Sequence, residues 1–270
     1  MKARMGCDYE NTNQTTVGII GVGVIGSALV KGFATAQPAC SLLLSSRSRE
    51  NMTQLAAEFP EQVRLAADNQ QVLDEAEWVI LSIPPAQGET ILKSLRFRPE
   101  NKVINLMADK SLEKIAGWIG HTALLAHIVP LPFVAQHLGP IVIYPHSEEL
   151  YDLMSPLGQI VVAKNSHEVH VLQSITALMA PFDTLLDKIV RWAGENGVDE
   201  MPAKAFTTAF FGAICQQVSQ VQAGRLSELA DEMTPGGLNA MAKEYINKNQ
   251  GFNLWPEALK PVIERLSASV

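Results

Sequence analysis

The feature that most constrains this chain is a regular alternation of short apolar runs and helix-like segments over residues 16–165. The apolar runs lie at residues 17–20, 42–44, 78–81, 103–106 and 124–128. Helix-like segments separate most of them, notably at residues 52–59, 86–95 and 112–119. Strands that are apolar on both faces are typical of a parallel sheet covered by helices on each side. We therefore expect a doubly wound α/β domain, with two further strands at 141–143 and 160–162 near its far edge.

The pattern changes near Lys164, and we find no strand pattern in the sequence after it. Asn165 can cap a helix there, with Glu168 as its reciprocal capping partner. Long helical stretches follow at residues 167–193, 202–222 and 238–249. A last helix after Trp255 contains Pro261, which should kink it or split it in two. The sequence thus predicts a flexible tail at residues 1–15, an α/β domain at 16–165 and an all-α domain at 166–270.

Composition excludes several classes of protein. With 47% hydrophobic and 18% charged residues, the chain is globular rather than fibrous or disordered. A net charge of −7 leaves no basic stripe for phosphates, so we expect no nucleic-acid partner. Cys7, Cys40 and Cys215 form no C-x-x-C pair, which fits a reducing cytosol and predicts a cytoplasmic protein. The longest apolar-leaning stretch, residues 123–144, contains three prolines, and the tail is too polar for a signal peptide, so we expect no membrane segment.

A G-x-G-x-x-G motif directly follows the first apolar run and opens a helix. Gly21 permits the tight turn, Gly23 lets the backbone approach a pyrophosphate, and Gly26 lets the helix pack against the strand. Backbone N–H groups at the helix N-terminus would then hold the negative charge. A glycine-rich turn without a ligand is the alternative, but the strand, motif and helix together favour a Rossmann-type dinucleotide site.

The segment after the second apolar run indicates the type of dinucleotide. An NAD site usually places an acidic residue there for the ribose 2′-hydroxyl. Residues 45–49 read Ser-Ser-Arg-Ser-Arg and contain no acid before Glu50. Because hydroxyls and a guanidinium such as that of Arg47 suit a 2′-phosphate, we predict that this segment favours NADP(H) over NAD(H). The alternative is a solvated loop whose arginines are incidental.

Several short segments occur in a specific order and spacing. They are VGIIGVGVIG (17–26), SSRS (45–48), ADN (67–69), WVILSIPP (78–85), VINLMA (103–108), SLEK (111–114), TPGG (234–237) and GF (251–252). On these segments the chain resembles a divergent member of the pyrroline-5-carboxylate reductase family over nearly its whole length after the tail. The resemblance implies NAD(P)H-dependent hydride transfer to the C=N bond of a small cyclic imino acid, in proline biosynthesis or a related reaction. It also implies that the all-α domain is a dimerisation domain, giving a homodimer or a higher homo-oligomer.

The resemblance also assigns residues by position. It places Gly21, Gly23, Val24, Ile25 and Gly26 on the pyrophosphate, Ser46 and Arg47 on the 2′-phosphate, and Asn69 on the adenosine side. Ser82, Ile83 and Pro84 would line the dinucleotide, and Met107 and Ala108 would lie near the nicotinamide. For Pro84 and Met107, plain packing at a strand end is nearly as good an explanation.

The chain departs from the family where substrate would bind. The family's Met-Pro-Asn-Thr-Pro segment is Val-Pro-Leu-Pro at residues 129–132, without the asparagine. Its Pro-Gly-Gly-Thr-Thr is Pro-Gly-Gly-Leu-Asn at 235–239, so both hydroxyls that could bind a carboxylate are gone. The remaining candidates for substrate contacts are Thr176, Gly236, Gly237 and Asn239. The sequence identifies no general acid.

Other chemistries find less support. His167 and His170 lack a third ligand, so we expect exposed histidines and no metal site. Asp183 and Lys188 could reach a cleft but more often form a solvated helix face. Two further functions stay open: a non-catalytic NADP-binding sensor or degenerate relative, and a 3-hydroxyacid dehydrogenase-like enzyme. The latter usually has its catalytic lysine in a glycine-punctuated helix, a frame that Lys188 lacks.

Overall fold

The computed structural model describes residues 15–37, 39–45, 47–232 and 234–268. The described chain divides into two compact units. The first runs to Gln173 and includes the end of the chain from Arg265, and the second is Ser174–Glu264. The predicted tail at residues 1–15 lies almost wholly outside the described residues.

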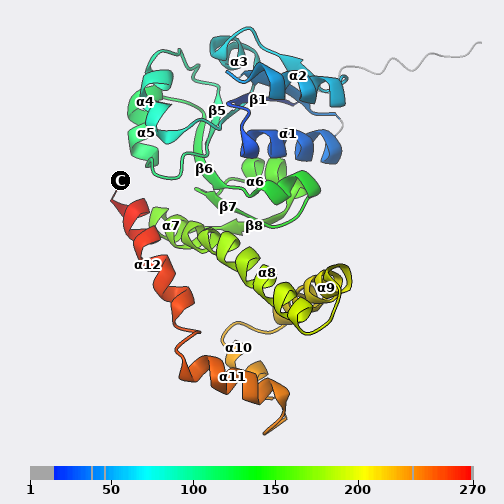
Figure 1. The fold of residues 1–270 in the computed structure, drawn as a ribbon. Coiled ribbons are helices and arrows are strands. Elements are labelled where there is room, and N and C mark those ends of the chain that lie inside the picture. The colour runs from blue at the N-terminus through cyan, green and yellow to red at the C-terminus, as the bar shows by residue number, and fades with distance from the viewer. Residues whose placement is uncertain (1–14, 38, 46, 233, 269–270) are drawn as a thin grey trace, which may run out of the picture. The chain divides into compact units, whose positions relative to one another are not determined.

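An eight-stranded sheet forms the centre of the first unit, in the order β3-β2-β1-β4-β5-β6-β7-β8 (Figure 1). The strands are β1 (Thr16–Ile20), β2 (Ser41–Ser45), β3 (Val63–Leu65), β4 (Trp78–Leu81), β5 (Lys102–Asn105), β6 (Leu124–Val129), β7 (Pro140–Tyr144) and β8 (Gln159–Val162). Neighbouring strands are parallel except for the antiparallel pair β6 and β7. The doubly wound α/β fold predicted from the alternation is confirmed.

Helices cover both faces of this sheet. They are α1 (Val24–Ala36), α2 (Arg49–Glu58), α3 (Asn69–Glu75), α4 (Pro85–Lys93), α5 (Leu112–Ile119), α6 (Glu148–Met154) and α7 (Ser166–Ile175), with the 3-10 helices η1 (Pro132–Gln136) and η2 (Ser155–Leu157). Adjacent residues of β1 show why the strands are apolar throughout. Ile19 packs in the core under α1, α2 and α6, whereas Ile20 packs in the core under α3, α4 and α5.

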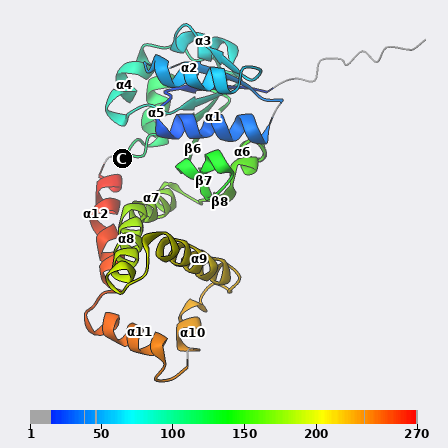
Figure 2. The same cartoon turned by 45° about the vertical axis from the view of Figure 1, so that its right-hand side comes forward.

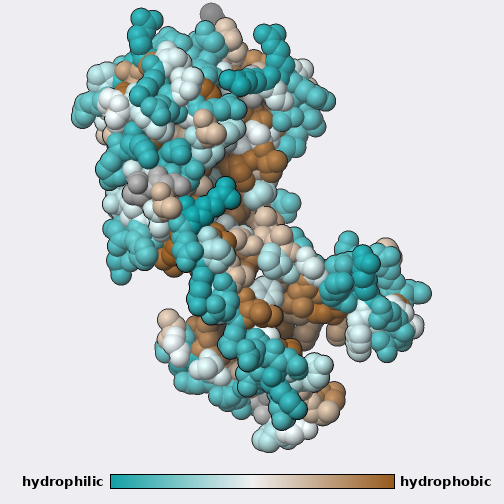
Figure 3. Space-filling model, turned by 60° about the vertical axis from the view of Figure 1, so that its left-hand side comes forward, coloured by the Kyte–Doolittle hydropathy of each residue, from teal (hydrophilic) through white to brown (hydrophobic). Residues whose placement is uncertain are grey.

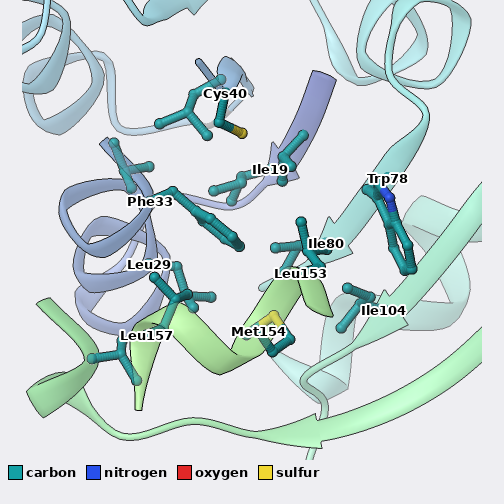
Figure 4. Close-up of a cluster of buried hydrophobic side chains, with 14 of the residues drawn as sticks. Ile19, Leu29, Phe33, Cys40, Trp78, Ile80, Ile104, Leu153, Met154 and Leu157 are labelled. Carbon is teal, nitrogen blue, oxygen red and sulfur yellow. The ribbon is translucent and has the colours of Figure 1, made fainter. Parts of the chain in front are cut away.

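The core on the α1 face joins parts of the chain that are distant in sequence. Leu29 and Phe33 of α1 lie near Leu153, Met154 and Leu157 of α6 and η2 (Figure 4), and all five belong to one buried cluster. Both ribbon views place α1 beside α6 (Figures 1 and 2). This face of the sheet is therefore completed only by the segment near residue 157.

Residues 166–173 belong to the first unit, although the sequence places them in the helical domain. Val169 of α7 is 1% exposed and packs with Val129 of β6 and Val142 of β7. The side chain of Asn165 accepts a hydrogen bond from the backbone of Glu168, as the capping pattern predicts. The carboxylate of Glu168 in turn accepts from the backbone of Lys164.

The second unit is helical. Its elements are η3 (Thr176–Leu178), α8 (Met179–Glu195), α9 (Glu200–Ser219), α10 (Leu226–Asp231), α11 (Leu238–Lys248) and most of α12 (Leu254–Ser267). α8 and α9 pack together (Figure 2), with Phe182 and Phe211 in an edge-to-face contact at 5.9 Å. The helical stretch 166–195 is long and apolar enough to cross a membrane by length and composition, and its first part, α7, covers the sheet as described.

Two elements differ from what the sequence predicts. The predicted strands do not include β3, in which Val63 is buried but Arg64 and Leu65 are exposed, so no apolar run marks it. Of the two outcomes expected at Pro261, a kink or a split, the split is wrong, because α12 is one continuous helix with Pro261 inside it.

Candidate functional site: a nucleotide cradle at the sheet edge

The strand order reverses between β1 and β4. From β1 the chain passes outward to β2 and β3, and it then returns to β4 on the other side of β1. In open α/β sheets, ligands bind outside the carboxyl ends of the strands at such a switch point. Gly21 follows β1 at this edge and Ser82 follows β4.

In the segment Gly21–Gly26, which we call the glycine turn, two of the three glycines have no room for a side chain. Gly21 has a φ of 96°, and a Cβ there would lie 2.1 Å from the carbonyl oxygen of Ser82. A Cβ at Gly26 would lie 2.3 Å from the carbonyl oxygen of Gly21. At Gly23, by contrast, a Cβ would meet no atom of the described residues within 4 Å. Gly23 therefore borders an open space that a ligand's phosphates could enter.

The start of α1 faces this space. Gly23 is the N-cap residue and supplies no side-chain cap, so the first backbone N–H groups of the helix are left for another acceptor. Val24 is 75% exposed and no acidic residue stands in the first turn. An uncapped, exposed helix N-terminus with no nearby carboxylate suits an anion. These residues fit the pyrophosphate of a dinucleotide.

The segment from β2 to α2 lies beside the glycine turn. Arg47 is exposed, while Ser46 lies outside the described residues. The hydroxyl of Ser45 donates to the Asn69 side-chain oxygen at 2.6 Å, so Asn69 is held at the end of β2. A hollow of about 240 Å³ opens between α1 and α2, and its lining residues are Gly23, Val24, Ser27, Lys31, Asn51, Gln54 and Leu55.

At the ends of β4 and β5, some of the predicted site residues have buried side chains, so that mainly their backbone could contact a dinucleotide. Ser82 is half-buried and Pro84 exposed, but the side chains of Ile83 and Met107 belong to the core. Asn105 holds the Met107 backbone on both sides: its side-chain oxygen accepts from the Met107 N–H at 2.9 Å, and its amide donates to the Met107 carbonyl at 3.2 Å. Met107 packs so closely on α4 that a Cβ at Gly88 would lie 2.6 Å from its sulfur. Ala108, which follows, is half-buried.

All the substrate candidates belong to the second unit. Thr176 begins η3 and is half-buried. Gly236 has a φ of 71°, and Gly237 is the N-cap residue of α11 without a side-chain cap. Asn239 is an exposed residue in the first turn of α11. Asp183 and Lys188 are both exposed on α8, as a solvated helix face would be.

The histidines differ from the sequence expectation. His167 is exposed, but His170 is only 7% exposed because α7 turns it towards the sheet, so the expectation that both are exposed was wrong for His170. The sequence analysis also did not single out His127 of β6, which is 5% exposed and whose Nε2 finds no hydrogen-bond partner among the described residues. Burial lowers the pKa of His127 to about 4, with a contribution from the nearby His170. Among the described residues, no three His, Cys, Asp or Glu side chains gather where they could hold a metal.

The part of the chain that contains the glycine turn matches a known protein family. Residues 16–109 match the protein family described as "NADP oxidoreductase coenzyme F420-dependent". The same residues contain the glycine turn and the β2–α2 segment, so the predicted cofactor, NADP(H), agrees with the type of this domain. A comparison with curated proteins finds no match.

Solved structures are similar over almost the whole chain. A 1-pyrroline-5-carboxylate reductase from Streptococcus pyogenes has a TM-score of 0.82 at 21% identity, covering 95% of this chain and 100% of its own. A Plasmodium falciparum pyrroline carboxylate reductase with NADP bound has a TM-score of 0.82 at 15% identity, with 96% and 99% covered. A reductive aminase from Aspergillus terreus, in complex with NADPH and ethyl levulinate, has a TM-score of 0.57 at 16% identity, with 82% and 78% covered. The chain thus has the fold of the pyrroline-5-carboxylate reductases, and its residues 16–109 match the NADP oxidoreductase family.

Proposed function

We propose that this protein is an NADP(H)-dependent reductase that transfers hydride to the C=N bond of a small cyclic imino acid. The observation that carries the proposal is the open space at Gly23, bordered by the uncapped start of α1 and by a β2–α2 segment without an acid before Glu50. A pyrophosphate fits the first feature. A 2′-phosphate beside Arg47 fits the second better than a free 2′-hydroxyl does.

The substrate class rests on the fold and on the resemblance in sequence. Two of the similar structures are named as reductases of pyrroline carboxylate, a cyclic imine, and the third as a reductive aminase. The reduced nicotinamide supplies the hydride when it is bound. This chain's contribution is to hold the dinucleotide at Gly21–Gly26, to fix the strand end at Met107 through Asn105, and to bind the acceptor. On sequence grounds we assign the last task to Thr176, the backbone of Gly236 and Gly237, and Asn239.

The test is oxidation of NADPH in the presence of pyrroline-5-carboxylate, followed by the loss of nicotinamide absorbance and repeated with NADH. We expect turnover with NADPH and much slower turnover with NADH. NADPH binding without turnover, on this substrate and on a panel of other cyclic imines and hydroxyacids, would instead identify a non-catalytic NADP-binding protein. Turnover on a hydroxyacid alone would identify the dehydrogenase alternative.

A second copy of this chain is the partner that we propose for the helical unit. Large apolar side chains on its helices face outward in the single chain: Phe206 is 73% exposed, Phe210 49% and Trp192 62%. Figure 3 shows apolar surface on the helices of this unit. Patches of this kind mark protein–protein interfaces. Sedimentation velocity should therefore give the mass of a dimer or of a higher homo-oligomer.

The cellular location that we propose is the cytoplasm. Cys215 is exposed and Cys40 is buried, and neither forms a disulfide within the described part of the chain. Exposed free thiols persist best in a reducing compartment. Fractionation of cells that produce the protein would test this location.

A further inference from the structure

The segment between β2 and α2 is fastened to the glycine turn at both of its ends. At the β2 end, the backbone N–H of Gly21 donates to the carbonyl of Ser45 at 2.7 Å. At the α2 end, the side-chain amide of Asn51 donates to the carbonyl of Val22 at 2.9 Å. Arg47 lies between these two attachments in the sequence and is exposed.

The Asn51 side chain provides the hydrogen-bond donor for a buried carbonyl of the glycine turn. Val22 is 1% exposed, and its carbonyl precedes the helical hydrogen bonds of α1. The first of those bonds runs from the Ser27 N–H to the Gly23 carbonyl. A buried carbonyl that loses its donor costs about 1–3 kcal/mol. Asn51 supplies that donor from α2, 29 residues further along the chain. The hydrogen bond thus couples the backbone of the glycine turn to the first turn of α2.

We propose that Asn51 is a positioning residue that sets the preference for NADP(H) over NAD(H). The inference rests on the proposed function and refines its cofactor site. A dinucleotide phosphate has its pyrophosphate and its 2′-phosphate at a spacing fixed by one adenosine ribose. Both can be bound at once only when Arg47 and the glycine turn keep a matching spacing, and the Asn51 bond holds that spacing. NADH lacks the 2′-phosphate and does not depend on it.

Other residues of the hollow do not carry this role. Lys31 is the cation nearest in sequence to the turn, but its ammonium is paired with the Glu58 carboxylate at 2.8 Å. Gln54 stands one turn after Asn51 on α2, is exposed, and finds no hydrogen-bond partner among the residues that the structure describes. Gln54 is therefore the matched control, because it shares the helix and the hollow but not the bond to Val22.

The experiment compares Asn51→Leu, Asn51→Gln and Gln54→Leu with the unchanged protein. Dissociation constants for NADPH and NADH are measured by fluorescence titration, and thermal unfolding of each variant is recorded. We expect Asn51→Leu to weaken NADPH binding about tenfold, which is about 1.4 kcal/mol, and NADH binding less than about twofold. Asn51→Gln, which keeps an amide donor, should recover part of the preference, and Gln54→Leu should keep all of it.

The outcomes separate this inference from the proposed function. Equal weakening of both cofactors by Asn51→Leu, or an unchanged ratio of the two constants, would overturn the positioning role and leave the reductase proposal intact. If the unchanged protein binds both cofactors equally, it has no preference for Asn51 to set, so the positioning role is overturned and the reductase proposal stays intact. If it binds neither nicotinamide cofactor, the proposed function fails and the inference fails with it. Should Asn51→Leu not fold, Asn51→Ala, which also lacks the amide donor, takes its place, and an unchanged ratio of the two constants in that variant counts against the role.

Discussion

The carbonyl oxygen of Gly21 lies so close to Gly26 that a Cβ on residue 26 would come within 2.3 Å of it. The contact seats the first turn of α1 directly on the end of β1. It also explains why the motif needs its last glycine, although residue 26 has an ordinary helical conformation. Gly23, between these two, has open space instead.

Gly26→Ala should destabilise the fold. The added methyl group must push α1 away from the Gly21 carbonyl, and overpacking of this kind costs about 1–3 kcal/mol. Urea unfolding followed by circular dichroism measures the loss. A variant as stable as the unchanged protein would mean that α1 is not held against β1 as described.

Gly23→Ala should leave the stability nearly unchanged and weaken NADPH binding. In the part of the chain that the structure describes, its Cβ meets no atom within 4 Å, but it enters the space that we assign to the pyrophosphate. We expect a loss of affinity of at least about tenfold by fluorescence titration. Undiminished affinity in a normally folded variant would place the pyrophosphate elsewhere.

Arg47→Ala should discriminate between the two cofactors. Arg47 is exposed, so its removal costs little stability, and the loss of a charged hydrogen bond to a 2′-phosphate is worth about 1.5–3 kcal/mol. NADPH affinity should fall about ten- to hundred-fold while NADH affinity hardly changes. Equal losses for both cofactors would contradict the assignment of a 2′-phosphate to this segment.

His127→Leu should remove part of the sensitivity to acid. The pKa of His127 is lowered by burial to about 4, below the value of about 6.5 in an unfolded chain, so the unfolded state binds the proton more readily. This histidine's contribution to stability is complete above about pH 6.5 and is lost as the pH falls towards 4, by about 3 kcal/mol. His170, whose pKa burial also lowers, acts with the same sign and remains in the variant.

The expectation is checked by free energies of unfolding measured at several pH values between about 7.5 and 4.5, a range that includes the histidine pKa of about 6.5 in an unfolded chain. The variant should lose less stability than the unchanged protein over that range. Parallel curves for the two proteins would show that His127 already takes up its proton in the folded state at an ordinary pH.

Phe206→Glu combined with Phe210→Glu should produce a monomer. The two rings stack at 6.1 Å on the exposed surface of α9, and a charge on each would oppose burial against a second copy. Sedimentation velocity gives the mass. Thr53→Glu, at an exposed position of α2 in the first unit, adds the same kind of charge and should leave the oligomer intact.

The sequence predicted those parts of the fold that carry a local signal. β1 was predictable because Ile19 and Ile20 are both buried, on opposite faces of the sheet, and the glycine motif follows at once. β3 was not, because it is a three-residue edge strand with one buried side chain. Its exposed residues resemble a loop in any pattern of hydrophobicity.

Parts of the candidate site depend on contacts across the chain, which no local pattern reveals. The bond from Asn51 to Val22 depends on how α2 sits against the glycine turn. Met107 could be named from the resemblance, but only the structure places its side chain in the core and leaves the backbone at the edge. His127 was hidden because a single polar residue in an apolar strand gives no signal of its own.

The core cluster that joins α1 to α6 and η2 has a consequence for how the chain acquires its structure during synthesis. Leu29 and Phe33 are produced early, but Leu153, Met154 and Leu157, which cover them, leave the ribosome more than a hundred residues later. Until then the apolar side of α1 has only part of its cover. The segment 16–109 contains the complete glycine turn, yet it would emerge with that side still open to chaperones and to aggregation.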